Sequence, residues 1–229
     1  MSDIREVYGI GNKKAVDLIK HYNIRDVKTL RKYVRKIPGL VSDIQKISLK
    51  YHDKISKPIS YKDASIHVKK ILKIIPSATI AGSYRRKQKT IGDIDVIIKT
   101  NMKNTINKLV KSGYIIAELE CGDKKFSGIS KVYNSYRRID IIYCTKEEYP
   151  FSLLYLTGDF VQNISMRQKA KKLKYSLSRY GLMNTKNNRY VNNIKTEEDI
   201  FKILNIKYKE PEFRSHNKFI KKKKKKKKI

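Results

Sequence analysis

The feature that most constrains this chain is a pair of aspartates inside an apolar run that otherwise reads as a buried strand. Residues 91–98 are Ile-Gly-Asp-Ile-Asp-Val-Ile-Ile, so one isoleucine separates Asp93 from Asp95. Side chains alternate across a strand, so residues i and i+2 point to one face and the two carboxylates must lie close together. Such a pair is stable only if a cation neutralises it or if the carboxyl pKa values rise. The run therefore predicts a strand with a compensated acidic site.

A second β-type run carries a third acid. Residues 136–143 are Tyr-Arg-Arg-Ile-Asp-Ile-Ile-Tyr, which places Asp140 where it could join the pair from a neighbouring strand. Carboxylate oxygens are hard ligands that suit Mg²⁺, and two metal ions can hold both the attacking and the leaving oxygen of a phosphoryl transfer. Taken singly, each motif also fits a simpler interpretation. The Asp-x-Asp pair could face solvent on an edge strand, and Arg137 and Arg138 could form ion pairs at the surface.

The segment before the acidic pair has the composition of a phosphate-binding turn. Residues 79–81 predict a short buried strand, Gly82 and Ser83 a tight turn, and residues 85–87 form a basic Arg-Arg-Lys cluster. The acids follow about ten residues later in the chain. Together these features favour a metal-dependent phosphoryl-transfer site over the simpler interpretations.

The N-terminal segment predicts a helical hairpin that binds phosphate. Gly9 and Gly11 bracket Ile10, Lys13 and Lys14 follow, and a helical pattern then leads to a second helix expected from Val27 to Leu30. Glycines permit positive φ and close approach of the backbone, while the N–H groups of the next helix point at a bound anion. The pattern is typical of a helix-hairpin-helix, which holds the DNA backbone without reading bases. An ordinary αα-hairpin with a glycine-rich turn fits it equally well.

The chain is strongly basic, with 54 Lys and Arg against 21 Asp and Glu and a net charge of +33. The excess is spread over its whole length, which predicts a nucleic acid partner lying along the protein, although an AT-rich gene also raises the lysine content. Residues 221–228 are eight consecutive lysines and are expected to be disordered. Added DNA affinity, nuclear import and a slippage product without a selected role all stay open for this tail.

Several protein classes are excluded by the pattern of apolar residues and cysteines. No apolar run approaches the ~18–20 residues that cross a bilayer, and the first ten residues lack the apolar core of a signal peptide. Cys121 and Cys144 have no paired metal-ligand spacing. We expect an intracellular protein without membrane or zinc, and the choice between nucleus and cytoplasm stays open.

Three motifs together resemble the nucleotidyltransferase palm of the family X DNA polymerases, of the polymerase beta type. They are Gly-Ser-Tyr-Arg-Arg at 82–86, Gly-Asp-Ile-Asp at 92–95 and Arg-Arg-Ile-Asp-Ile at 137–141. The resemblance continues through Tyr-Leu-Thr-Gly at 155–158 with Asn163 and Arg167, and it covers roughly residues 5–215.

The resemblance implies a role for each matching residue. Two Mg²⁺ ions, for which Mn²⁺ can substitute, would be held by Asp93, Asp95 and Asp140, with Arg138 steadying Asp140 and the primer end. The β- and γ-phosphates of a dNTP would be bound by Ser83, Arg86 and the Gly92 backbone. The sugar and base would be lined by Tyr155, Leu156, Thr157, Gly158 and Asn163. DNA would contact Gly9, Gly11, Lys13, Lys14, Arg167 and Tyr180, with a monovalent cation at the hairpin.

The chain also departs from the family pattern. Leu156 stands where an aromatic residue is usual beside the sugar, Asp159 and Phe160 differ near the base, and Tyr61 replaces an expected arginine. The chain starts at the second hairpin motif of the polymerase beta plan, so the N-terminal lyase domain and lyase activity are expected to be absent. These departures concern substrate choice and leave the three aspartates in place.

The expected fold is α+β in four parts. They are a helix-hairpin-helix DNA-binding region at 1–57, a nucleotidyltransferase palm with a mixed sheet at 58–146, a nucleotide-selecting C-terminal α+β region at 147–220, and the tail at 221–229. The expected function is a monomeric DNA-directed DNA polymerase that fills short gaps during repair, using gapped or primer-template DNA and dNTPs, with a DNA ligase partner left open. The alternatives are a template-independent nucleotidyl transferase and a non-catalytic scaffold that binds DNA ends.

Overall fold

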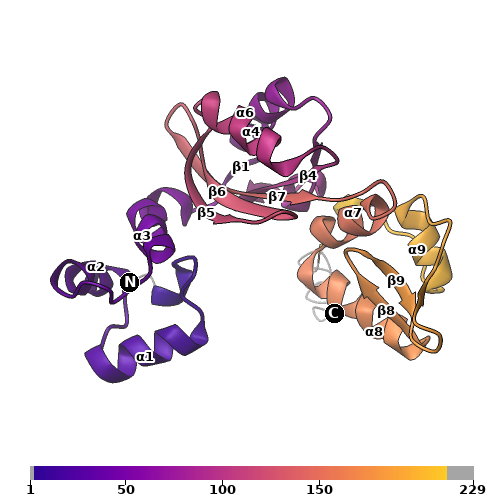
Figure 1. Cartoon of the computed structure of the whole chain (residues 1–229), viewed down its shortest axis with the longest axis horizontal. Coiled ribbons are helices and arrows are strands. Elements are labelled where there is room, and N and C mark those ends of the chain that lie inside the picture. The colour runs from indigo at the N-terminus through magenta and orange to yellow at the C-terminus, as the bar shows by residue number, and fades with distance from the viewer. Residues whose placement is uncertain (1–2, 216–229) are drawn as a thin grey trace, which may run out of the picture.

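The computed structural model describes residues 3–215, so the lysine tail lies outside the described residues. Three packed regions follow one another along the chain, with the central sheet between two smaller regions (Figure 1). The α+β class and the mixed sheet expected from the sequence are confirmed. Within residues 3–215, no helix is both long and apolar enough to cross a membrane.

The N-terminal region is helical. It contains the 3-10 turn η1 (Ile4–Glu6) and helices α1 (Asn12–Tyr22), α2 (Val27–Lys36) and α3 (Asp43–Ile55). Each of the last two begins at a side-chain cap: Asp26 accepts from the Thr29 amide, and Ser42 forms a capping box with Gln45. The second helix, expected at residues 27–30, continues to Lys36. The core of this region contains Ile4, Val7, Ile10, Ala15, Leu18, Ile24, Val27, Leu30, Leu40, Val41 and Leu49.

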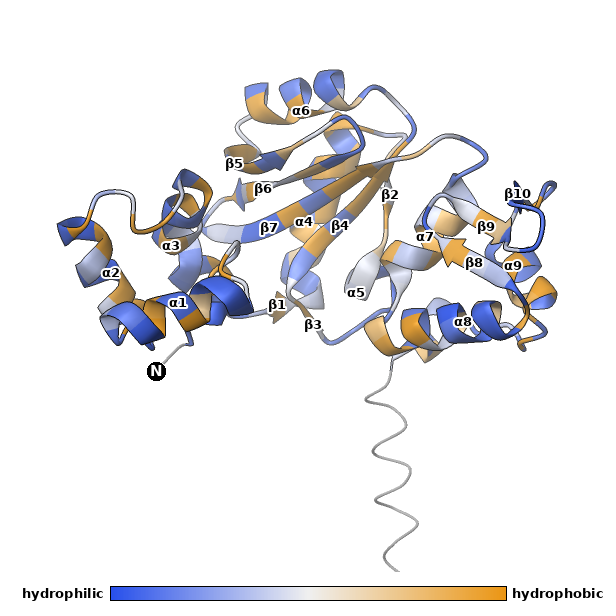
Figure 2. Cartoon of the chain, turned by 60° about the horizontal axis from the view of Figure 1, so that its bottom comes forward, coloured by the Kyte–Doolittle hydropathy of each residue, from blue (hydrophilic) through white to orange (hydrophobic). Residues whose placement is uncertain are grey.

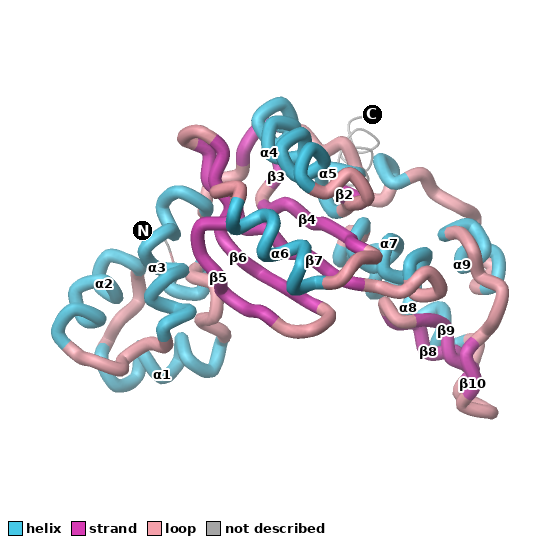
Figure 3. The backbone as a smooth tube through the Cα atoms, turned by 45° about the horizontal axis from the view of Figure 1, so that its top comes forward, coloured by secondary structure: helices cyan, strands magenta, loops and turns pink. Residues whose placement is uncertain are grey.

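The central region is built on a five-stranded sheet of order β2-β4-β7-β6-β5. Its strands are β2 (Thr79–Ile80), β4 (Asp93–Ile98), β5 (Ile115–Cys121), β6 (Lys125–Val132) and β7 (Ser135–Tyr143). β4 and β7 are parallel, whereas the other neighbours are antiparallel. Helices α4 (Tyr61–Ile74) and α6 (Met102–Lys111) cover one face of this sheet (Figure 3). β4 is mostly apolar, whereas β7 alternates polar and apolar residues over much of its length (Figure 2), and Ile94, Ile139 and Ile141 of these strands are fully buried.

Two elements differ from the sequence predictions, in both cases at a glycine. The strand expected over residues 91–98 is interrupted at Gly92, so β3 (Thr90–Ile91) pairs with β1 (Ile59–Ser60) and β4 begins separately at Asp93. The turn expected at residues 82–83 is the start of the short helix α5 (Gly82–Arg85).

The C-terminal region packs helices against a three-stranded sheet. Its elements are α7 (Tyr149–Thr157), α8 (Phe160–Lys172), β8 (Tyr175–Ser178), β9 (Gly181–Asn184), β10 (Arg189–Tyr190), α9 (Glu197–Ile203) and the 3-10 turn η2 (Pro211–Phe213). Their core contains Phe151, Leu154, Met166, Ala170, Leu182, Ile194, Ile200, Phe201 and Leu204.

A buried ion-pair triad connects the central and C-terminal regions. The Glu197 carboxylate at the start of α9 accepts from Arg85 Nη2 at 2.7 Å and from Arg214 Nη1 at 2.5 Å. Arg85 Nη1 also donates to Thr157 Oγ1 at 2.7 Å. Burial alone would raise the pKa of the Glu197 carboxyl, but the hydrogen bonds from both arginines outweigh it and hold the pKa below its usual range. The triad therefore fixes α5 against the ends of α7 and α9.

A buried histidine on α4 makes stability depend on pH. His67 is fully buried, and its ring nitrogens lie 3.2 Å from the Tyr114 hydroxyl and 3.0 Å from Ser135 Oγ. Burial, reinforced by the charge of Arg137, lowers the pKa of His67 to about 4. Between pH 6.5 and pH 4 the His67 imidazole is therefore mostly protonated in the unfolded chain and mostly neutral in the folded protein. The free energy of unfolding falls as the pH falls through this window.

We expect the His67 contribution to the free energy of unfolding to fall by up to about 3 kcal/mol between pH 6.5 and pH 4. Urea unfolding of the parent and of His67→Gln at several pH values measures this loss, and the variant should show a shallower slope across the window. His21→Gln is the matched control, because His21 is exposed on α1 and should leave the slope unchanged. Parallel slopes in the parent and His67→Gln would contradict the prediction.

Candidate active site

The three aspartates lie on the face of the central sheet opposite α4 and α6. The parallel register of β4 and β7 pairs Asp95 with Asp140, and Asp93 with Arg138. The alternate residues of β4, such as Ile94, point instead into the core beneath α4 and α6. Two strands about 40 residues apart in sequence thus bring the predicted carboxylates together.

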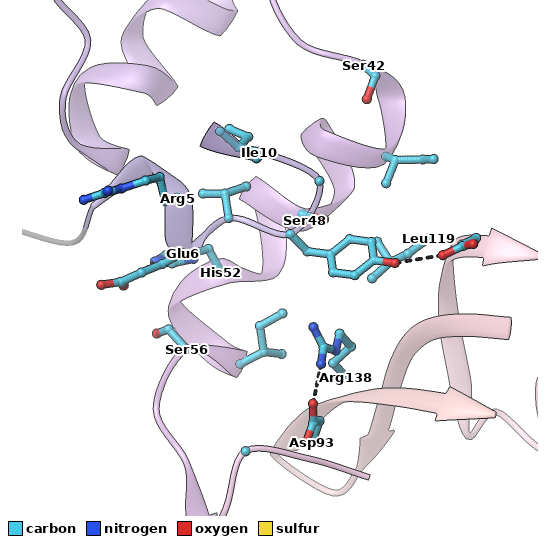
Figure 4. Close-up of a pocket in the computed structure, with 18 residues that line it drawn as sticks. Arg5, Glu6, Ile10, Ser42, Ser48, His52, Ser56, Asp93, Leu119 and Arg138 are labelled. Atoms are coloured by element: carbon cyan, nitrogen blue, oxygen red, sulfur yellow. Dashed lines mark hydrogen bonds and ion pairs between the residues drawn. The ribbon is translucent and has the colours of Figure 1, made fainter. Parts of the chain in front are cut away.

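Arg138 lies among these carboxylates and binds two of them. Its Nη2 donates to Asp93 Oδ2 (Figure 4). The same Nη2 lies 3.1 Å from Asp140 Oδ2. The guanidinium also lies 5.4 Å from the ring centroid of Tyr8, which belongs to the N-terminal hairpin. Asp140 accepts a further hydrogen bond of 2.5 Å from Ser127 Oγ on β6. Asp93 and Asp140 are therefore oriented by neighbouring side chains.

Of the three aspartates, Asp95 has the fewest contacts that stabilise its negative charge. In the described part of the chain its carboxylate accepts no hydrogen bond and forms no ion pair within 4 Å. Burial raises the pKa of Asp95 well above its usual range, and the charges of Asp93 and Asp140 add to the rise. Burial also raises the pKa of Asp140. The positive charges of Arg138 and Arg86 lower the pKa of Asp95 but do not outweigh this rise.

The donor set fits a hard divalent cation, although the side chains are not arranged around one. Among residues 3–215, no three His, Cys, Asp or Glu side chains form a group that could hold a metal ion as they lie. Arg138 is the cation that balances Asp93 and Asp140 in this arrangement. Three carboxylates on one face, with Asp95 unpaired, nevertheless provide the oxygen ligands that Mg²⁺ prefers.

Gly82 allows the backbone at the start of α5 to lie very close to the Asp95 carboxylate. A Cβ atom at this position would lie 1.8 Å from Asp95 Oδ2, and the residue has a φ of +56°. Only glycine combines this backbone conformation with room for the carboxylate. The sequence pattern predicted a turn residue here and gave no sign that Gly82 makes space for Asp95, because the contact joins separate strands.

Polar groups on and around α5 are arranged for an anion. Ser83 Oγ is buried and has no hydrogen-bond partner within the described residues. Arg86 Nη1 donates to the carbonyl oxygen of Thr157, and burial lowers the pKa of Arg86. Gly92 has open space around its Cα atom. The structure thus brings these three residues to one edge of the sheet beside Asp93.

The residues expected around a sugar and base come from α7, the turn after it and α8. Asn163 Nδ2 donates to the Tyr155 carbonyl oxygen at 2.8 Å, and the Arg167 guanidinium lies 5.5 Å from the Tyr155 ring centroid. Gly158 ends α7 with a φ of +60°. Leu156 is different: its side chain packs against a small palm cluster that contains Ala81, Ile97 and Cys144.

The N-terminal hairpin and Asp93 line a common cavity of about 920 Å³ (Figure 4). Gly9, Gly11, Asp93 and Arg138 all line this cavity. Tyr8 bridges it, because its hydroxyl donates to Glu120 Oε2 at 3.0 Å. The cavity is the space in which a ligand of the hairpin would meet the carboxylates.

The two hairpin glycines differ in conformation. Gly9 has a φ of +86° and its carbonyl accepts from Gln45 Nε2 at 2.7 Å. Gly11 has a φ of −79° and is the N-cap of α1, so the positive φ considered for both glycines occurs only at Gly9. Lys13 and Lys14 lie in the first turn of α1, and Lys14 is 3.5 Å from Asp17.

Tyr180 lies apart from these residues in the turn between β8 and β9. Its hydroxyl accepts from Arg179 Nη2 at 2.6 Å, and Lys124 Nζ lies 5.2 Å from its ring centroid. Sequence reasoning missed Ser127, which bonds Asp140 from the neighbouring strand, and the pair Glu197 and Arg214, which holds Arg85.

Comparisons with known proteins identify relatives of two parts of the chain. Residues 62–146 match the DNA polymerase beta palm, and residues 152–215 match the DNA polymerase beta thumb. The DNA polymerase/3′-5′ exonuclease PolX of Bacillus subtilis (strain 168) is 28% identical over 76% of this chain and 33% of its own length. DNA polymerase lambda of Rattus norvegicus is 27% identical over 90% of this chain and 40% of its own length. The chain thus spans only a third to two fifths of these two relatives.

A shorter relative and two solved structures complete the comparison. Repair DNA polymerase X of African swine fever virus (isolate Tick/Malawi/Lil 20-1/1983) is 29% identical over 63% of this chain and 85% of its own length. Leishmania infantum polymerase beta in a ternary gap complex has a TM-score of 0.83 at 22% identity, covering 93% of this chain and 88% of that one. Its ternary P/T complex has a TM-score of 0.81 at 24% identity, covering 93% and 97%. At these identities the structures establish the shared fold.

Proposed function

Because the chain belongs to the family X DNA polymerases, we propose that it adds dNTPs to a primer 3′-hydroxyl on gapped or primer-template DNA. The observation that carries this proposal is the convergence of Asp93, Asp95 and Asp140 on one sheet face, beside a cavity that the hairpin glycines also line. Short gap filling in DNA repair is the proposed setting, and one relative bears the name repair DNA polymerase.

Three aspartates would hold the divalent ions in this proposal. Asp93, Asp95 and Asp140 would ligate two Mg²⁺, which neutralise charge on the phosphoryl oxygens and lower the pKa of the attacking hydroxyl when bound. Asp140, oriented by Ser127, would accept the proton of the primer 3′-hydroxyl. Arg138 would keep Asp140 in place while the primer end approaches.

The remaining residues would bind nucleotide and DNA. The unpartnered Ser83 hydroxyl, the Arg86 guanidinium and the Gly92 backbone would hold the β- and γ-phosphates. The sugar and base would contact Tyr155, Leu156, Thr157, Gly158 and Asn163. DNA would contact Gly9, Gly11, Lys13, Lys14, Arg167 and Tyr180, with a monovalent cation bound by carbonyls of the hairpin.

Primer extension on a duplex with a one-nucleotide gap tests the proposal. We expect incorporation of the complementary dNTP with Mg²⁺, a slower or absent reaction on primer alone, and complete loss with a chelator. Equal extension of primer alone would favour a template-independent nucleotidyl transferase. Tight DNA binding with no metal-dependent incorporation would favour the non-catalytic scaffold.

Gly82→Ala tests whether the close approach to Asp95 matters for catalysis. The new Cβ would overlap Asp95 Oδ2 and strain a backbone with positive φ, so Asp95 must move. A displacement of about 1 Å in a catalytic group can cost about 10²-fold, and we expect kcat/KM to fall by that order. Gly122→Ala is the control, since its Cβ would meet only the Lys125 carbonyl oxygen at 3.7 Å. Equal rates in the two variants would show that Asp95 tolerates the displacement.

A further inference from the structure

A second large cavity lies at the other end of β4 from the aspartates. It has a volume of about 810 Å³ and is lined by residues of both the central and the C-terminal region. Asp93 is the first residue of β4 and Lys99, which lines this cavity, directly follows its last residue. At about 3.3 Å per residue the cavity begins about 20 Å from Asp93. It is therefore separate from the aspartate site.

The cavity presents an aromatic ring that is exposed but held in place. Tyr190 is 57% exposed and lines the cavity. A Cβ atom at Gly181 would lie 2.7 Å from Tyr190 Cδ1, so the ring packs directly on the glycine backbone. The pairing of Tyr190 with Met183 across β9 and β10 fixes the backbone that carries the ring. A fixed ring loses little conformational entropy when a ligand stacks on it.

The charges around this ring favour an anion. Lys99, Lys146 and Lys195 line the cavity, and Glu147 is its only acidic lining residue among those described. Lys99 Nζ also lies 4.6 Å from the ring centroid of Tyr149. Exposed aromatic rings combined with lysines bind single-stranded nucleic acid, because unpaired bases stack while the ammonium groups contact phosphates. Bases inside a duplex do not offer free faces for such stacking.

The cavity adjoins the residues expected to bind the nucleotide. Phe151 lines both this cavity and a smaller one that contains Tyr155, Asn163 and Arg167. Ser178 lines the smaller cavity and Tyr180, two residues later, lines the larger one. The turn between β8 and β9 therefore connects the walls of the two cavities.

We propose that this cavity binds the unpaired template strand on the 5′ side of the templating base, with one base stacked on Tyr190. The inference rests on the proposed function for the identity of the strand. The stacking and the phosphate contacts follow from the ring, the lysines and the shared wall at Phe151.

Binding of the full chain to two primer-template duplexes tests the proposal. Both duplexes carry a six-nucleotide 5′ template overhang, of deoxyadenosines in one and of abasic sites in the other, so their charges match. Fluorescence anisotropy without dNTP or metal should give an about tenfold lower Kd for the base-bearing overhang. Tyr190→Ser should reduce this ratio to about one and leave the Kd of the abasic duplex unchanged, whereas Tyr190→Phe should preserve the ratio.

Tyr133→Ser is the matched control, because Tyr133 is 83% exposed in the turn between β6 and β7 and does not line the cavity. A ratio of about one in the parent, or an undiminished ratio in Tyr190→Ser, would overturn the proposal. The proposed function is judged separately by incorporation on gapped DNA. Incorporation without a base-dependent ratio would reject this inference alone. A base-dependent ratio without incorporation would reject the polymerase proposal, and with it the identity of the strand as template, but would leave the cavity as a site for unpaired bases.

Discussion

Asp95→Asn and Asp140→Asn are each expected to lower the rate of nucleotide incorporation at least about a thousandfold, which corresponds to about 4 kcal/mol of lost transition-state stabilisation. Each substitution removes a carboxylate that we propose as a metal ligand and barely changes side-chain volume. Asp95 is the buried carboxylate without a hydrogen bond, so its charge has no function in holding the fold together. The Asp95 variant should therefore remain folded, whereas Asp140→Asn also weakens an ion pair to Arg138 but keeps an oxygen that can accept from Ser127. The affinity of both variants for gapped DNA should stay within about twofold of the parent.

Single-turnover incorporation on gapped DNA, together with anisotropy on the same DNA, measures both effects. Asp123→Asn is the control, because it makes the same chemical change at an exposed position between β5 and β6 and should retain the parental rate. Near-parental rates in the Asp95 or Asp140 variant would show that these residues are not metal ligands.

Glu197→Gln is expected to reduce the free energy of unfolding by about 3–5 kcal/mol. The carboxylate is almost completely buried between Arg85 and Arg214, and the Arg214 side chain is wholly inaccessible. Glutamine keeps the shape but removes the negative charge, so a buried guanidinium is left without compensation. Because the ion pairs hold the Glu197 pKa down, the same stability should also be lost as the pH falls through the carboxyl range.

Urea unfolding at pH 7 measures this change. Glu198→Gln is the matched control: the neighbouring glutamate is exposed in the same first turn of α9 and should alter stability by less than about 0.5 kcal/mol. A loss of under about 1 kcal/mol in Glu197→Gln would mean that the triad contributes no more than a surface ion pair.

The sequence could predict the parts of the site that depend on local spacing. The i, i+2 spacing of Asp93 and Asp95 determines that they share a face, and the alternation around Asp140 indicates a second strand. The resemblance of these motifs to the family X polymerases is confirmed by the palm and thumb matches. The assigned roles of individual residues remain proposals.

Contacts between distant segments could not be predicted in the same way. Arg85 and Glu197 are 112 residues apart, and no pattern near either residue indicates that the two side chains form an ion pair. Gly82 illustrates the same limit, because its close contact to Asp95 depends on the neighbouring strands β2 and β4. The sequence predicts only a contact between Leu156 and the nucleotide sugar. In the structure its side chain also packs into a palm cluster, which forms only after folding.

Arg138 gives the acidic face an internal counter-ion. The guanidinium bonds Asp93 and Asp140, so the chain itself compensates part of the negative charge of these acids. A divalent ion held by these aspartates would share them with a positive charge that belongs to the chain, which would lower the affinity of the ion. A nucleoside triphosphate bound beside them would add negative charge and raise that affinity. Under the proposed function, a divalent ion would therefore bind the aspartates more tightly when a nucleotide is present than it would bind the free protein.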